Sequence, residues 1–136
     1  MHFLVRSIIA GTGAAGLMAP ALAADMTDSE IKAFLSGKTV YLEATAASSS
    51  GQAGQGVIYW AEDGTALYKT PSGAIFHGKW EIKGNTNCTN WKERPNMGCV
   101  RYDKIGDVIT VIDIASGQVR AKVLKTAPGN AEKLAP

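Results

Sequence analysis

Hydrophobic and polar residues alternate with the two-residue period of β-strands along most of the chain after Lys38. Clusters of turn-forming residues, such as Glu62-Asp63-Gly64 and Ser116-Gly117, interrupt this pattern at regular intervals. We therefore expect strands near 39–45, 57–61, 65–70, 74–83, 87–92, 98–103, 108–114 and 118–124. These eight short antiparallel strands predict a mainly β fold, arranged as a small barrel or sandwich.

The alternation also assigns residues to the two faces of a strand. In the stretch 74–83 one face is expected to carry Phe76, Trp80 and Ile82, which leaves His77 on the opposite, solvent-facing side. In 118–124 the apolar residues point one way, and Arg120 is expected on the wet face.

The run DVITVIDIA, residues 107–115, is apolar on both faces. A strand of this kind is expected at the centre of a sheet, or beneath a covering helix.

Residues 27–37, TDSEIKAFLSG, are the segment with a helical period. Thr27 and Glu30 have the spacing of a capping box, and Ile31, Phe34 and Leu35 form one apolar stripe. A helix this short is unstable alone, so we expect it to pack against the sheet.

Two segments have compositions typical of flexible chain. Residues 45–56, TAASSSGQAGQG, are rich in Ala, Ser and Gly and predict a flexible loop. Residues 126–136, TAPGNAEKLAP, predict a flexible C-terminal tail.

The first 23 residues have the features of a secretory signal peptide. Arg6 precedes a short apolar region, and Ala21-Leu22-Ala23 matches the A-x-A cleavage pattern. The apolar region contains three glycines and stops at Pro20, so it is too short and too interrupted for a stable membrane span. The mature protein is expected in the periplasm or secreted, with a single β-rich domain at 24–125.

The charge of the mature chain argues against a nucleic-acid partner. Of 14 basic residues in the chain, Arg6 lies in the predicted signal peptide, which leaves 13 basic against 12 acidic residues. The basic residues are scattered and form no patch along the sequence.

Cys88 and Cys99 are the two cysteines of the chain, and paired cysteines in an exported protein usually form a disulfide. They lie near the starts of two predicted neighbouring strands, across a loop that contains Pro95 and Gly98. Closing a loop this short stabilises a domain by about 3 kcal/mol. A redox site would favour the C-x-x-C spacing, and a zinc site would need further Cys or His ligands.

The mature chain contains one histidine, His77, which could act with Met97 as a haem or copper ligand. Its position on the polar face of its strand favours an ordinary surface histidine, because a lone histidine is a weak signal for a ligand. No serine or cysteine nucleophile is linked to it by a recognisable motif, and therefore we assign no catalytic, cofactor-binding or metal-binding residue.

The domain is rich in aromatic residues, which either fill the core or line a ligand cavity in the mouth of a barrel. The alternation does not decide between these two arrangements. The residues in question are Trp60, Trp80, Trp91, Tyr41, Tyr59, Tyr68 and Tyr102.

The chain resembles a family of small exported bacterial proteins, family 995 of the domains of unknown function, over roughly residues 28–112. The similarity rests on GKTVY (37–41), YWAEDGT (59–65), GKWEI (78–82) and CTNW (88–91), followed by Cys99. This resemblance implies export, a β-rich domain and a Cys88–Cys99 pair, and it implies no established activity. PSGAIF (71–76) also resembles the S-G-x-x-Y/F loop of periplasmic lysozyme inhibitors.

These features favour a non-enzymatic periplasmic or secreted binding protein for a small ligand, an envelope component or a protein partner. The candidate binding surface consists of Trp91, Lys92, Arg94, Ser72 and Phe76. One alternative is a lysozyme-type inhibitor that inserts the 70–76 loop into an enzyme cleft. Another is a small haem or metal carrier, or a small enzyme, centred on His77.

Overall fold

The computed structural model of the chain describes residues 24–136. The predicted signal peptide, 1–23, lies outside the described residues. None of the helical structure in residues 24–136 has the length and apolarity that crossing a bilayer requires.

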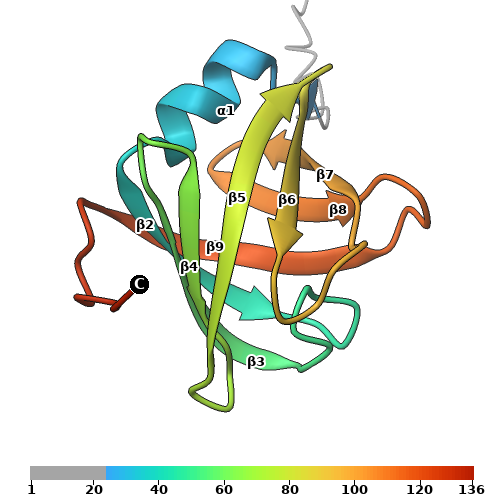
Figure 1. The fold of residues 1–136 in the computed structure, drawn as a ribbon. Coiled ribbons are helices and arrows are strands. Elements are labelled where there is room, and N and C mark those ends of the chain that lie inside the picture. The colour runs from blue at the N-terminus through green and yellow to red at the C-terminus, as the bar shows by residue number, and fades with distance from the viewer. Residues whose placement is uncertain (1–23) are drawn as a thin grey trace, which may run out of the picture.

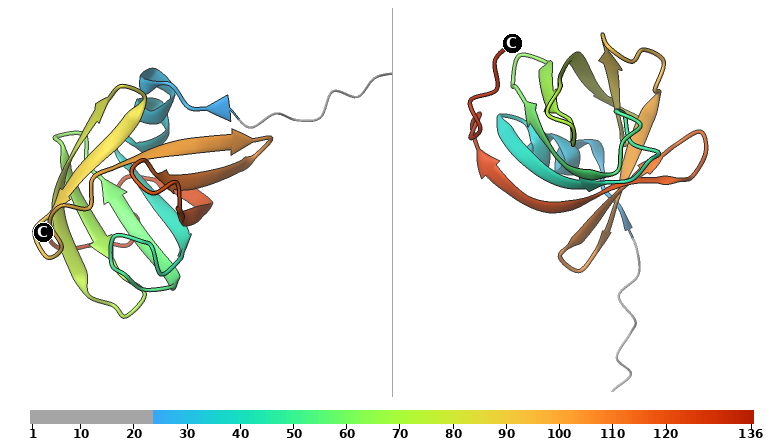
Figure 2. Two further views of the ribbon diagram at one scale, coloured as in Figure 1. Left: turned by 90° about the vertical axis from the view of Figure 1, so that its right-hand side faces the viewer. Right: turned by 90° about the horizontal axis from the view of Figure 1, so that it is seen from below.

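Eight antiparallel strands, β2 to β9, form a closed barrel (Figure 1, Figure 2). Each strand pairs with the next one in the sequence, and β9 pairs with β2 to close the barrel. The two-residue strand β1 pairs with β7 at Asp103 and Lys104, beyond the residues of β7 that pair with β6. The elements are β1 (Ala24–Asp25), α1 (Asp28–Leu35), β2 (Lys38–Ala44), β3 (Gly54–Trp60), β4 (Thr65–Lys69), β5 (Ile75–Lys83), β6 (Thr86–Trp91), β7 (Cys99–Ile105), β8 (Val108–Asp113) and β9 (Val119–Pro128).

The helix α1 covers one end of the barrel, which we call the helix end (Figure 1). Thr27 and Glu30 form the predicted capping box, and Ile31 and Leu35 are fully buried. The start of the helix is tied to the β5–β6 turn, because the Asp28 N–H donates to Asn85 Oδ1 over 2.9 Å. The predicted helix is therefore confirmed, and it closes one opening of the barrel.

The barrel interior is packed with aromatic side chains. Trp60 lies 5.5 Å from Trp80 and 6.2 Å from Trp91 between ring centroids, and Tyr68 lies 5.7 Å from Trp91. These are ordinary edge-to-face and tilted contacts. A Cβ on Gly78 would lie 2.7 Å from Cε3 of Trp91, so a glycine is needed where the β5 backbone meets this ring.

The predicted faces of β5 are confirmed, because Phe76, Trp80 and Ile82 pack against the core. The expectation for 107–115 is wrong. Within residues 24–136 each of the eight barrel strands has a neighbour on both sides, so β8 is no more central than the others, and α1 packs on β2, β5 and β6. In β8 Val111 and Ile112 are buried and Ile109 packs against the core, while Val108 is exposed.

The two segments expected to be flexible are ordered by side-chain contacts. Residues 54–56 belong to β3, and the loop before them is held by Ser48, whose hydroxyl donates to the Gln52 carbonyl over 2.9 Å. Residues 126–128 belong to β9, and the segment after them returns along the outside of the barrel (Figure 2). Leu134 is buried there, so residues 126–136 are packed against the barrel, in contrast to the expected tail.

Candidate functional site

The most unusual buried side chain of the barrel is that of Arg120, which is 5% exposed. Strict alternation placed it on the wet face of β9, and this is wrong. Val111 pairs with Ala121 and Ile112 pairs with Val119, so Arg120 is an extra residue at a β-bulge. A bulge reverses the side-chain alternation locally, and here it turns Arg120 inward and leaves Val119 exposed.

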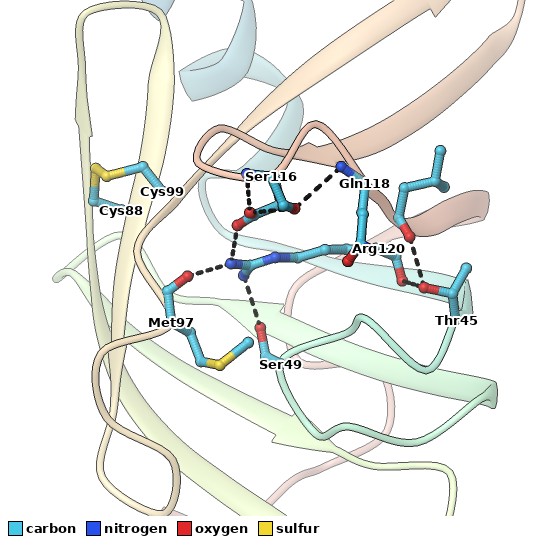
Figure 3. Close-up of polar contacts among 10 residues, drawn as sticks. Thr45, Ser49, Cys88, Met97, Cys99, Ser116, Gln118 and Arg120 are labelled. Carbon is cyan, nitrogen blue, oxygen red and sulfur yellow. Dashed lines mark hydrogen bonds and ion pairs between the residues drawn. A yellow bond between two sulfur atoms is a disulfide. The ribbon is translucent and has the colours of Figure 1, made fainter.

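The guanidinium of Arg120 joins three parts of the chain (Figure 3). It donates to the Met97 carbonyl in the β6–β7 loop and to Asp113 Oδ1 at the end of β8. It also donates to the Ser49 hydroxyl in the β2–β3 loop, over 3.4 Å. A buried charge is costly unless it is paired and hydrogen-bonded, and these contacts supply both.

Asp113 is fixed for this role by the short turn that follows it. The Ser116 hydroxyl and N–H donate to Asp113 Oδ2 over 2.6 and 2.8 Å. The Ser116 hydroxyl, and then the Ser116 N–H and Arg120, hold the pKa of Asp113 below its ordinary value. The carboxylate therefore stays ionised opposite Arg120 at neutral pH.

The β2–β3 loop is the centre of the end of the barrel opposite α1. We call this end the loop end; it consists of residues 45–53, 70–74 and 92–98, and the first of these segments contacts both of the others. Gln52 Oε1 accepts from the Ser72 N–H over 3.2 Å. Gly51 lies beneath Arg94, since a Cβ on this glycine would lie 2.1 Å from Arg94 Nη1.

The base of the β6–β7 loop is closed by the Cys88–Cys99 disulfide, as predicted. The two cysteines are directly opposite each other on β6 and β7, with their Cα atoms 4.1 Å apart. Residues 24–136 contain no free cysteine. The disulfide and the Met97–Arg120 bond therefore hold the same loop from two sides.

The structure separates the five residues of the predicted binding surface. Trp91 is 2% exposed and packs in the core, so its assignment to the surface is wrong. The alternation of β6 explains this, because Trp91 shares its inward face with the buried Asn87. Lys92 and Arg94 are exposed at the loop end.

Ser72 and Phe76, the residues of the inhibitor-like motif, lie in different surroundings. Ser72 is exposed in the β4–β5 turn, where its hydroxyl pairs with that of Thr70 over 3.1 Å. Phe76 packs edge-on against Tyr68, with ring centroids 6.0 Å apart. The two side chains therefore do not form one exposed motif, although Ser72 belongs to the loop end.

His77 lies on the outer wall, as the alternation predicted, with 43% of its side chain exposed. Its ring Nδ1 lies 2.5 Å from Glu93 Oε1, and its N–H donates to Glu93 Oε2 over 2.7 Å. Partial burial opposes ionisation of Glu93, but the bonds from the His77 ring and N–H lower the pKa of this carboxyl. The histidine is thus paired with Glu93, while the Met97 carbonyl is bonded to Arg120.

Within residues 24–136, no three His, Cys, Asp or Glu side chains come together as a metal site. The barrel interior keeps a cavity of about 50 Å³, lined by Trp60, Tyr68, Trp91, Tyr102 and Arg120 among others. Burial raises the pKa of Tyr102, although the Asn87 amide, which donates to its hydroxyl over 3.0 Å, opposes this. A cavity of this size has room for a few waters, so most of the aromatic residues fill the core.

Comparison with family models, with curated proteins and with solved structures gives no match for this chain. The resemblance to family 995 of the domains of unknown function therefore stays a prediction.

Proposed function

We propose that this protein is a non-enzymatic extracytoplasmic binding protein that recognises an anionic envelope component or an anionic protein surface through its loop end. The observation that carries the proposal is the burial of Arg120 between the β2–β3 and β6–β7 loops. The bonds from Arg120 to Ser49 and Met97, which we call the Arg120 clasp, order two loops that would otherwise be free. Ordering before binding lowers the entropic cost of recognition.

The charge of the loop end indicates the chemistry of the partner. Residues 45–53 and 70–74 contain no charged side chain, and 92–98 contain Lys92, Glu93 and Arg94. Glu93 is engaged by the ring and the N–H of His77. Lys92 and Arg94 outnumber this one carboxylate, so the net charge of the loop end is positive and favours an anionic surface.

The size of the interior cavity also supports recognition at the surface. At about 50 Å³ the cavity is far smaller than the pockets of 300–1,000 Å³ that usually hold small organic ligands. A macromolecular partner, which needs no interior space, fits the barrel better than a ligand of drug or lipid size.

An extracytoplasmic location is supported by the Cys88–Cys99 disulfide, since disulfides persist in oxidising compartments. The signal-peptide pattern of residues 1–23 supports the same location.

The proposal is tested by titrating the mature protein with poly-L-glutamate, and with neutral dextran as a reference, at low and physiological salt. We expect binding to poly-L-glutamate alone, weakened by salt, and weakened severalfold more in the double variant Lys92→Gln/Arg94→Gln. The control Lys83→Gln/Lys104→Gln changes the net charge equally, at residues outside the loop end. An equal loss in both variants, or no binding by the wild type, would contradict the proposal.

A further inference from the structure

The last eight residues of the chain form a strap across the outer wall of the barrel, defined as residues 129–136. The Gly129 N–H donates to the Gly37 carbonyl over 2.8 Å, where the strap leaves β9. Thr39, which is fully buried, donates from its hydroxyl to the Gly129 carbonyl over 2.6 Å and accepts from the Ala131 N–H over 3.0 Å. One hydroxyl on β2 thus bonds two backbone groups of the strap, at Gly129 and Ala131.

The end of the strap has its own fixed conformation. The Asn130 side chain accepts from the Leu134 N–H and donates to the Leu134 carbonyl, both over 2.9 Å. Glu132 Oε1 accepts from the Tyr41 hydroxyl over 2.7 Å. Leu134 is only 8% exposed although just two residues of the sequence follow it.

The place that receives Leu134 is an apolar groove on the outside of the barrel. Tyr59 and Leu67 face outward from β3 and β4, opposite each other in the sheet, and they line the groove together with Leu134 and Pro136. Leu67 is nearly buried although its neighbours Ala66 and Tyr68 are the ones that face the core. The strap therefore covers apolar surface that an isolated barrel would expose to water.

The groove is larger than the strap requires. Its open volume is about 810 Å³, and it continues from Leu134 and Pro136 to Lys79, Asn90 and Lys92. Its charged lining residues are these two lysines and Asp63, and it is also lined by His77, which is paired with Glu93. The balance of charge in the groove is positive, which suits the carboxylate at the end of a chain.

We propose that this groove is a peptide-binding site whose resident occupant is the strap. The partner is the C-terminal segment of another protein, with an aliphatic side chain near its end and a free carboxylate. The strap is held by one backbone–backbone bond, a few bonds to side chains and one leucine, outside the β-ladder of the barrel, so it belongs to the least stable part of the structure. A partner segment binds only when the strap has left the groove. The apparent affinity of the partner is therefore its intrinsic affinity multiplied by the fraction of time for which the groove is free.

The test uses a fluorescent peptide with the sequence of residues 129–136, GNAEKLAP, added to the full chain. The full-length variant Leu134→Ser, whose strap lacks its anchor, is expected to bind this peptide at least tenfold more tightly than the wild type. The peptide carrying Leu134→Ser should not bind either protein. Adding Lys79→Gln to the Leu134→Ser protein should weaken binding severalfold.

A second variant tests the same proposal and leaves Leu134 unchanged. Tyr41→Phe removes the bond to Glu132 and keeps an aromatic ring beneath Lys125, whose Nζ lies 4.5 Å from the ring centroid. It should also bind the peptide more tightly than the wild type does. Equal binding by all proteins, no binding by any of them, or a dimer formed by exchange of straps would overturn the proposal. Circular dichroism of each variant shows that the barrel has folded.

Discussion

The guanidinium of Arg120 donates to the backbone carbonyl of Met97, a residue 23 positions earlier in the chain. This bond connects a bulge in β9 to the long β6–β7 loop. Together with the contacts of Arg120 to Asp113 and Ser49, it connects the β2–β3 loop, the β6–β7 loop and the end of β8. The following predictions test this arrangement and the fold that supports it.

Replacing Arg120 with Met should destabilise the protein by about 3–5 kcal/mol, because the buried partners of the guanidinium lose their hydrogen bonds. Urea unfolding measures this loss. Lys122→Met, at an exposed position of the same strand, is the matched control and should change stability by less than about 0.5 kcal/mol. Similar values for the two variants would mean that the clasp contributes little.

Reducing the Cys88–Cys99 disulfide should lower the free energy of unfolding by about 3 kcal/mol, since its loop spans 11 residues. The melting temperature with and without reductant measures the effect. The double variant Cys88→Ala/Cys99→Ala should melt at the lower temperature and show no response to reductant. A wild-type melting temperature that reductant leaves unchanged would refute a stabilising role.

Acid should weaken the fold partly through Asp113. Its pKa is lower in the folded state than in the unfolded chain, so its contribution is present above the ordinary Asp pKa of about 3.9. This contribution is lost as the pH falls through the lower, folded value. The free energy of unfolding, measured by urea titration from about pH 6 to about pH 2, should fall less steeply in Asp113→Asn. Parallel curves for the two proteins would exclude this linkage.

A methyl group at position 78 should disturb the aromatic core. In Gly78→Ala the new Cβ meets the Trp91 ring and lies 3.1 Å from the Asn90 carbonyl oxygen, so backbone as well as side chain must shift. We expect a loss of about 1–3 kcal/mol in urea unfolding. Lys79→Ala, at the next and exposed position, provides the comparison. A Gly78→Ala protein as stable as this control would mean that the core accommodates the methyl group.

The sequence predicts the antiparallel strands well, because alternation and turn residues are local signals. It left a barrel and a sandwich as alternatives, because closure depends on the pairing of β2 with β9, which are far apart in the sequence. The sequence favours a surface position for Trp91, and this is wrong. Trp91 shares the inward face of β6 with Asn87, a polar residue that is buried because its amide bonds the Tyr102 hydroxyl. Because β6 carries polar residues on both faces, hydrophobicity alone does not identify its inward face. The alternation was nevertheless present, and could have placed Trp91 inside.

Arg120 and the strap were not accessible to the same reasoning. A bulge shifts the side-chain period by one residue and depends on the pairing partner, so the sequence of β9 alone favours an outward Arg120. The strap is held by Thr39, some 90 residues away, and by a single leucine in a polar segment. Contacts so distant in sequence leave no local pattern.

The central claim is that Arg120 joins the two loops into one preorganised surface, and amide hydrogen exchange tests it most directly. Arg120→Lys keeps the charge but has too few donors in the right geometry to reach all three partners. We predict faster exchange in both 45–53 and 92–98, with unchanged protection of the β3–β4–β5 strands. Unchanged exchange in both loops, or a change in only one of them, would contradict the account.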